Sequence, residues 1–206
     1  MSSSIKSQTI KGVVWSSVER FSMQGAQFVM GIIMARLLTP DDYGLIGMIL
    51  VFTSISQVFI DGGFANALIQ RQDRSETDFS TVFYINLGIS ILFYTLLYLL
   101  APYIASFYEQ PLLTNITRVY AITLILNSIT AVNRTKLVIA VDFKTQTKIS
   151  FIAAILSGVI GVYCAYTNYG VWAIVAQAIS FSIFNIILNF LLQYYFFSNY
   201  NIINNS

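Results

Sequence analysis

Histidine is absent from this 206-residue chain, and cysteine occurs once, as Cys164. Without histidine, the chain cannot build Ser-His-Asp or Cys-His catalytic groups, histidine-ligated metals or a histidine proton relay. A single cysteine forms neither a disulfide framework nor a cysteine-based metal site within one chain. No paired acids or nucleophile arrangement is recognisable either, so we expect a protein that is not an enzyme and that uses no cofactor or metal.

Charged residues are scarce as well. They make up 10% of the chain, against 56% for hydrophobic residues, whereas an ordinary soluble domain is about a quarter charged. This balance excludes a water-soluble fold of this size. Lysine and arginine number 11 and the acids 9, which gives a net charge of +2 and no indication of a nucleic-acid partner.

Long apolar segments, separated by short polar breaks, fill most of the chain. A spanning helix needs about 20 largely apolar residues, because a hydrocarbon core of roughly 30 Å is crossed at 1.5 Å per residue. We therefore predict one all-α membrane domain over residues 1–206, a bundle of six transmembrane helices. The expected spans are residues 12–38, 43–68, 79–107, 112–132, 149–166 and 171–197.

The basic residues are distributed unevenly between the connections of these spans. Because lysine and arginine in short loops resist translocation, the richer side is expected to be cytoplasmic. Placing both termini in the cytoplasm puts Arg36 and Arg118 on the outer side and Arg20 within a span. The inner side then holds Lys6, Lys11, Arg71, Arg74, Arg134, Lys136, Lys144 and Lys148. We expect a multi-pass protein of the bacterial inner membrane with this orientation.

The longest expected connection, residues 133–148, combines basic residues with an apolar patch at 137–141. Two interpretations stay open for it. It is either a solvated loop that obeys the positive-inside rule or an interfacial segment that lies on the inner leaflet.

Polar and small residues recur along one face of the first expected span. Ionisable groups inside a span are costly and usually face a partner or a water-filled cavity. The recurring residues are spaced by three or four positions, which stacks them on one helix face. One interpretation is a stripe that lines a hydrophilic cavity, with Arg20 contacting a phosphate and the glutamines contacting sugar hydroxyls; the other is helix–helix packing. The stripe comprises Ser16, Arg20, Gln24, Gln27, Gly31 and Ala35.

Two acids inside spans are candidates for ion coupling or gating. Glu19 is adjacent to Arg20, but neighbouring residues of a helix point about 100° apart and need not pair. Asp61 lies late in the second expected span and precedes Gly62 and Gly63, a pair that could kink or unwind the helix. Asp61 is therefore either functional, as a cation or proton site or in a salt bridge that breaks during transport, or an acid near the inner interface that snorkels or caps the helix.

Two segments resemble a known family. They are Ala35–Gly44, with the letters ARLLTPDDYG, and Asp61–Arg71, with the letters DGGFANALIQR. Both look like the polysaccharide exporters of the multidrug/oligosaccharidyl-lipid/polysaccharide superfamily, which include the Wzx-type O-antigen and lipopolysaccharide flippases. Asn133–Arg134 and Asp142–Lys144 also resemble the inner loop of that family.

This resemblance implies a protein that flips undecaprenyl-pyrophosphate-linked oligosaccharide from the cytoplasmic to the periplasmic leaflet. Its expected partners are this lipid-linked substrate, membrane lipids and the polysaccharide assembly machinery. A cationic cavity of the family would be matched by Arg20, with Arg36 and Arg118 near its outer mouth. Family members have two lobes related by repeat, and this chain resembles the N-terminal lobe of such a MATE-like fold. The chain is then expected to be a truncated half of the transporter, or else a second lobe or a second copy of the chain completes it. The alternatives are half of a multidrug-type exporter of the same superfamily, which favours acidic and aromatic cavity groups, and a membrane assembly subunit without transport of its own.

Overall fold

The structure is a computed structural model that describes residues 21, 24–25, 27–61, 75–139 and 143–204. Glu19, Arg20 and the Gly62–Gly63 pair lie outside these residues. The described residues form helices joined by short connections and contain no strand. In chain order they comprise a helical segment Gln27–Leu37, α2 (Pro40–Asp61), α4 (Glu76–Phe107), α5 (Leu112–Tyr120), α6 (Ile122–Ile139), α7 (Phe143–Tyr166) and α8 (Trp172–Asn204).

Five helical stretches in the described residues are long and apolar enough to cross a membrane. One of them, Leu112–Leu137, joins α5 and α6 across Ala121, whose backbone keeps helical angles of −61° and −16°. Of the first predicted span, the described residues form a shorter apolar helix, Gln27–Leu37, which is not counted among the five. These elements confirm the expected all-α membrane bundle, whereas the orientation of the termini stays a prediction.

The first two breaks in the apolar pattern are built as helix caps. Thr39 and Asp42 bond reciprocally: the amide N of Asp42 donates to Thr39 Oγ1 at 3.3 Å, and the amide N of Thr39 donates to Asp42 Oδ2 at 2.9 Å. Pro40 follows at the first helical position, where the missing N–H costs nothing. Ser75 and Asp78 form the same capping box before α4. Asp42 and Asp78 are therefore helix-capping acids.

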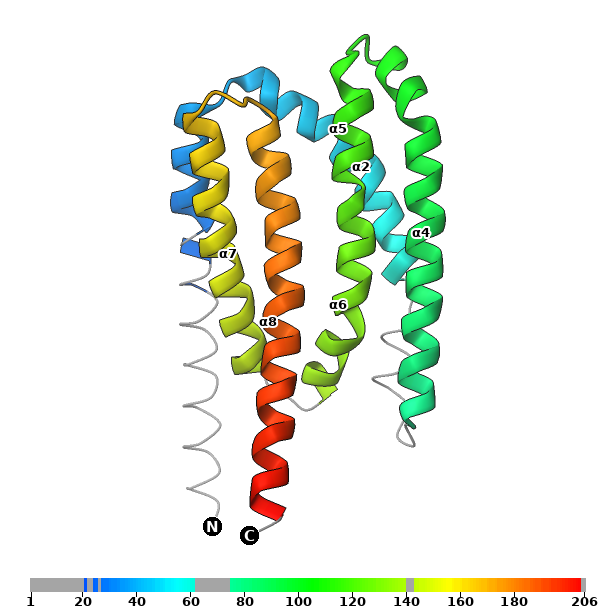
Figure 1. Ribbon diagram of the computed structural model, residues 1–206. Helices are drawn as coiled ribbons and strands as arrows, with labels where there is room; N and C mark the ends of the chain where they lie inside the picture. Colours follow the sequence, from blue (N-terminus) through cyan, green and yellow to red (C-terminus); the bar gives the residue numbers. More distant parts are fainter. Residues whose placement is uncertain (1–20, 22–23, 26, 62–74, 140–142, 205–206) are drawn as a thin grey trace, which may run out of the picture.

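The connections gather at the two ends of the bundle (Figure 1). The turn before α2, the α4–α5 connection and the α7–α8 connection lie at one end, and the start of α4 lies at the other. Gly170 in the α7–α8 connection has a φ of +56°, and a Cβ there would lie 3.0 Å from Asp42 Oδ1. At the opposite end, the Lys136 amine of α6 lies 4.7 Å from the centre of the Phe79 ring of α4.

Three apolar clusters hold the helices together. The largest packs α2 against α5 and α8 through buried residues such as Ile49, Leu113 and Val175. A second joins α2, α4 and the α5–α6 span, and a third joins the first helix to α7 and α8 through Met34, Ala165 and neighbouring residues. Many large apolar side chains remain outside these clusters and are exposed. So much exposed apolar surface is unusual for a soluble monomer and suits a bundle whose solvent is lipid.

Residues 133–148 differ from the expected open connection. Helix α6 continues to Ile139 and α7 begins at Phe143, so most of this stretch is helical. Hydropathy marks where the lipid core ends, but a helix satisfies its own backbone groups and can continue beyond that level. The solvated-loop interpretation is wrong for the described part of this stretch, and the interfacial interpretation stays a prediction.

Candidate functional site

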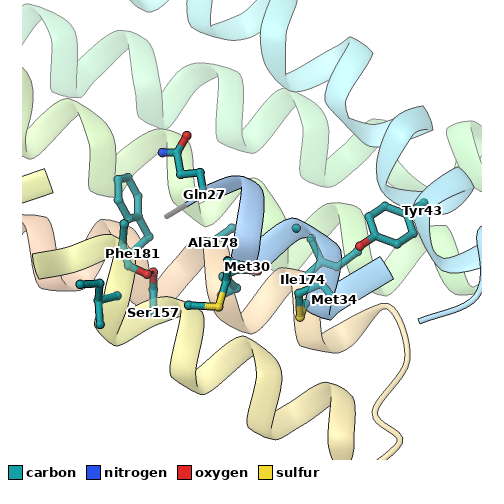
Figure 2. A pocket seen from close by; sticks show the side chains of 12 residues that line it. Gln27, Met30, Met34, Tyr43, Ser157, Ile174, Ala178 and Phe181 are labelled. Atoms are coloured by element: carbon teal, nitrogen blue, oxygen red, sulfur yellow. The ribbon is translucent and has the colours of Figure 1, made fainter. Parts of the chain in front are cut away.

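A cavity of about 360 Å³ lies between the first helix, α7 and α8, with Tyr43 of α2 at its edge (Figure 2). In this view Gln27 and Phe181 lie toward one end and Tyr43 toward the other, with its hydroxyl oxygen directed at the other lining side chains. The remaining lining residues are Met30, Gly31, Met34, Ala154, Ile155, Ser157, Ile174, Gln177 and Ala178.

Two glycines of α7 position the side chains around this cavity. A Cβ at Gly158 would lie 3.0 Å from Cγ of Met30 and would overlap the terminal methyl group of that residue. A Cβ at Gly161 would lie 2.9 Å from Cβ of Gln177. The missing side chains therefore leave room for Met30 of the first helix and Gln177 of α8 to lie directly against α7. Both residues line the cavity.

The polar groups of the cavity lie at membrane depth. Gln27 is ten residues before Leu37, the last residue of its helix, which corresponds to about 15 Å along the axis. Gln177 is five residues after Trp172, the first residue of α8, or about 7.5 Å. Both residues therefore lie at least one helical turn from these ends of their helices; Gln177 is half-buried and Gln27 is exposed.

Neither amide is satisfied by the protein. In the part of the chain that the structure describes, Gln27 and Gln177 have no hydrogen-bond partner. Ser157 differs, because its hydroxyl donates to the carbonyl of Ala154 at 3.1 Å. An amide that lacks a partner in hydrocarbon costs several kcal/mol, so these two groups require water or a polar ligand. No charged residue is among the described residues that line the cavity, and its amides and phenol suit a hydroxyl-rich ligand.

The predicted stripe on the first helix reaches this cavity only in part. Gln27 and Gly31 line it, whereas Gln24 and Ala35 are exposed and do not. Arg36 is exposed on the last turn of the helix and is not among the lining residues. The phosphate-binding role of Arg20 falls on a residue outside the described ones and stays a prediction.

The other predicted site residues lie away from the cavity. Arg118 packs against α4, where its Cζ lies 4.4 Å from the centre of the Tyr98 ring. Asp61 is exposed at the end of α2 and accepts a hydrogen bond of 2.9 Å from Nε2 of Gln57, one helical turn earlier. This contact leaves both interpretations of Asp61 open. The structure thus brings Gln27 to the cavity and leaves Arg36, Arg118 and Asp61 outside it.

Gln177 and Tyr43 line the cavity but were not predicted as site residues from the sequence. Gln177 is the one amide between Val171 and Phe184, a largely apolar stretch, and that isolation was a usable signal. Tyr43 offered none, because it follows the capping acids and reads as the start of a span. Its place at the cavity depends on how the turn before α2 folds against α8.

The fold and the cavity together define a class of protein: a multi-pass helical membrane protein with a partly polar cavity between three helices. The family whose model matches residues 33–200 is described as polysaccharide biosynthesis protein. The match covers most of the chain, and the chain belongs to this family.

Curated relatives agree with this assignment. The teichuronic acid biosynthesis protein TuaB of Bacillus subtilis (strain 168) is 33% identical over 177 residues, which cover 86% of this chain and 36% of the relative. The succinoglycan biosynthesis transport protein ExoT of Rhizobium meliloti (strain 1021) is 25% identical, with coverage of 86% and 36%. The lipopolysaccharide biosynthesis protein WzxC of Escherichia coli (strain K12) is 28% identical, with coverage of 52% and 22%. The chain thus spans about a third of the length of its first two relatives, and no solved structure matches it significantly.

Proposed function

We propose that this chain takes part in moving a lipid-linked oligosaccharide, carried on undecaprenyl pyrophosphate, across the bacterial inner membrane for surface polysaccharide synthesis. The observation that carries the proposal is the cavity, which is lined by Gln27 and Gln177 of two different helices, neither with a hydrogen-bond partner among the described residues. Family membership supplies the context, because relatives are named for the biosynthesis or transport of polysaccharides. The chain performs no covalent chemistry in this proposal.

The charge distribution supports the direction of transport. The end of the bundle that carries Arg134, Lys136 and Lys148 is the cytoplasmic end, by the positive-inside rule. The turn before α2 and the α7–α8 connection then face the periplasm, as does Tyr43 at the edge of the cavity. The oligosaccharide would contact the amides through its hydroxyl groups, while the pyrophosphate would require cations outside the described cavity, such as Arg20.

The chain matches only part of the length of its relatives, which bears on how a complete transport pathway is built. Because the chain spans 36% of the length of TuaB and of ExoT, we propose that further helices complete the pathway, from a second lobe or a second copy. An exporter of organic cations is less well supported, because such a ligand favours acidic groups and the described cavity lining has none.

Deletion of the gene in its own host tests the proposal. Loss of surface polysaccharide, with accumulation of the lipid-linked oligosaccharide on the cytoplasmic leaflet, is expected, and the wild-type gene should reverse both effects. The measurements are surface polysaccharide and the leaflet distribution of the lipid-linked intermediate, with membrane abundance of the chain as the control. Unchanged polysaccharide and unchanged intermediate after deletion would reject the proposal.

A further inference from the structure

Arg118 places a positive charge inside a membrane-spanning stretch. It lies six residues after Leu112, the first residue of α5, which corresponds to about 9 Å along the axis. The side chain is half-buried and belongs to the span Leu112–Leu137. An arginine at such a level needs a partner, a wet cavity or a route to the interface, because an isolated charge is costly there.

One partner of Arg118 is a backbone group that Pro102 releases. In α4, the carbonyl of Tyr98 would normally accept from the amide of residue 102, but Pro102 has no N–H. Arg118 Nε donates to this carbonyl instead, at 3.4 Å. The long distance makes the bond weak, yet it ties the guanidinium to one place on α4.

The second partner is the ring of the same tyrosine. Arg118 Cζ lies 4.4 Å from the centre of the Tyr98 ring, within the range of a cation–π contact. Tyr98 also packs against Tyr94, with ring centres 6.0 Å apart. The guanidinium is thus held by a ring and a carbonyl that both belong to Tyr98, which fixes its orientation.

These contacts leave most of the guanidinium unused. Arginine has five N–H donors, and the bond from Nε uses one of them. Arg118 has no ion pair with any acid in the described part of the chain. The two Nη groups therefore keep their full capacity, at a fixed place on the α4–α5 surface. Planar guanidinium groups with free Nη atoms bind phosphate oxygens in pairs.

We propose that Arg118, oriented by Tyr98, binds the phosphate group of a membrane lipid in the leaflet at the α4–α5 end of the bundle. Arginine side chains inside a span extend toward the headgroup level, where phosphate oxygens are the available anions. Tyr98 is exposed to 41%, so the site opens on the surface of the bundle. This site is separate from the cavity, since neither residue lines it, and the inference does not depend on the proposed transport.

Native mass spectrometry of the purified full chain tests the site, with dioleoylphosphatidylglycerol as the probe. The wild-type protein should bind this lipid, and Arg118→Gln should weaken binding about tenfold. Arg36→Gln is the matched control, because Arg36 is an exposed arginine beside the turn before α2 that contacts no aromatic ring or carbonyl of the described residues. It should change binding less than twofold. Equal binding by wild type and Arg118→Gln would overturn the proposal.

Variants of Tyr98 test the same lipid site without changing Arg118, in case Arg118→Gln does not fold. Tyr98→Leu removes the ring and should weaken lipid binding about threefold, while Tyr98→Phe keeps the ring and should bind as the wild type does. Dioleoylglycerol, which lacks the phosphate, should not bind at this site, and inorganic phosphate should not compete at equal concentration. Binding of the phosphate-free lipid that is lost in the same variants, or displacement by inorganic phosphate, would overturn the assignment to a lipid phosphate.

Discussion

Polar side chains have hydrogen-bond partners in the packing between α4, α6 and α8, whereas the two glutamines of the cavity have none among the described residues. Between α4 and α6, the hydroxyls of Ser90 and Ser128 lie 3.0 Å apart, and both residues are fully buried. Between α6 and α8, Ser182 Oγ donates to Asn127 Oδ1 at 2.9 Å. In the cavity, the amides of Gln27 and Gln177 find no such partner among the residues that the structure describes.

This difference separates helix packing from a candidate site. Short side chains such as serine also bond back to their own helix, as Ser90 does to the carbonyl of Leu87 at 2.8 Å, so they are cheap to bury. A glutamine amide has four hydrogen-bonding positions on a longer side chain and needs an external partner if the protein gives none. The contrast has limits, because Asn86 Oδ1 and Thr117 Oγ1 are buried without partners on the α4–α5 side.

The largest expected effect comes from making the cavity apolar. The double variant Gln27→Leu, Gln177→Leu should lower polysaccharide export roughly tenfold or more, because two hydrogen bonds of about 1 kcal/mol each are lost. Export is measured as surface polysaccharide at matched membrane abundance. Exposed Gln24 serves as the control, and Gln24→Leu should leave export unchanged. Normal export in the double variant would show that the cavity is ordinary packing.

A second variant tests the close packing of α7 against α8 beside the cavity. Gly161→Val should destabilise the protein by about 1–3 kcal/mol, since the new side chain must displace Gln177 from a well-packed contact. Gly88→Val is the matched control, because a Cβ there meets nothing within 4 Å. Thermal unfolding in detergent compares the two. Equal melting temperatures would mean that α7 and α8 are not packed as closely as the structure has them.

The smallest effect is expected in the paired region. Ser90→Ala should cost about 0.6 kcal/mol, the average for interhelical hydrogen bonds in a membrane bundle. A double-mutant cycle with Ser128→Ala, followed by unfolding in a denaturing detergent, isolates the coupling between the two hydroxyls. Additive effects would show that each serine bonds only within its own helix. Export should stay normal in all three variants.

The fold was largely predictable because each helix carries its own signal. Apolar length predicts a span, and the TPDD sequence at Thr39–Asp42 predicts a stop followed by a capped start. Residues 133–148 were less predictable, since hydropathy locates the membrane boundary and not the end of hydrogen bonding. The first predicted span is described as a continuous helix only over the shorter apolar segment Gln27–Leu37, and Arg20 lies outside the described residues.

The candidate site was predictable only where a single helix carries it. The place of Gln27 at a cavity is predicted by the spacing on the first helix, but Gln177 belongs to α8. The approach of these two helices to α7 depends on Gly158 and Gly161. Pro102 predicts a weakened helix, because it leaves the carbonyl of Tyr98 without its usual N–H donor. Nothing in the sequence indicates that Arg118 lies against that carbonyl. Contacts between segments far apart in the chain require the packed bundle.

The approach of Gly170 to Asp42 has a practical consequence for mapping topology. A tag or reporter inserted into the α7–α8 connection would meet a crowded site, because even a Cβ at Gly170 would lie 3.0 Å from the carboxylate of Asp42, which caps α2. Such an insertion would disturb the cap as well as the connection. The α4–α5 connection is the better place for a reporter, because Glu109, Gln110 and Pro111 are all exposed there.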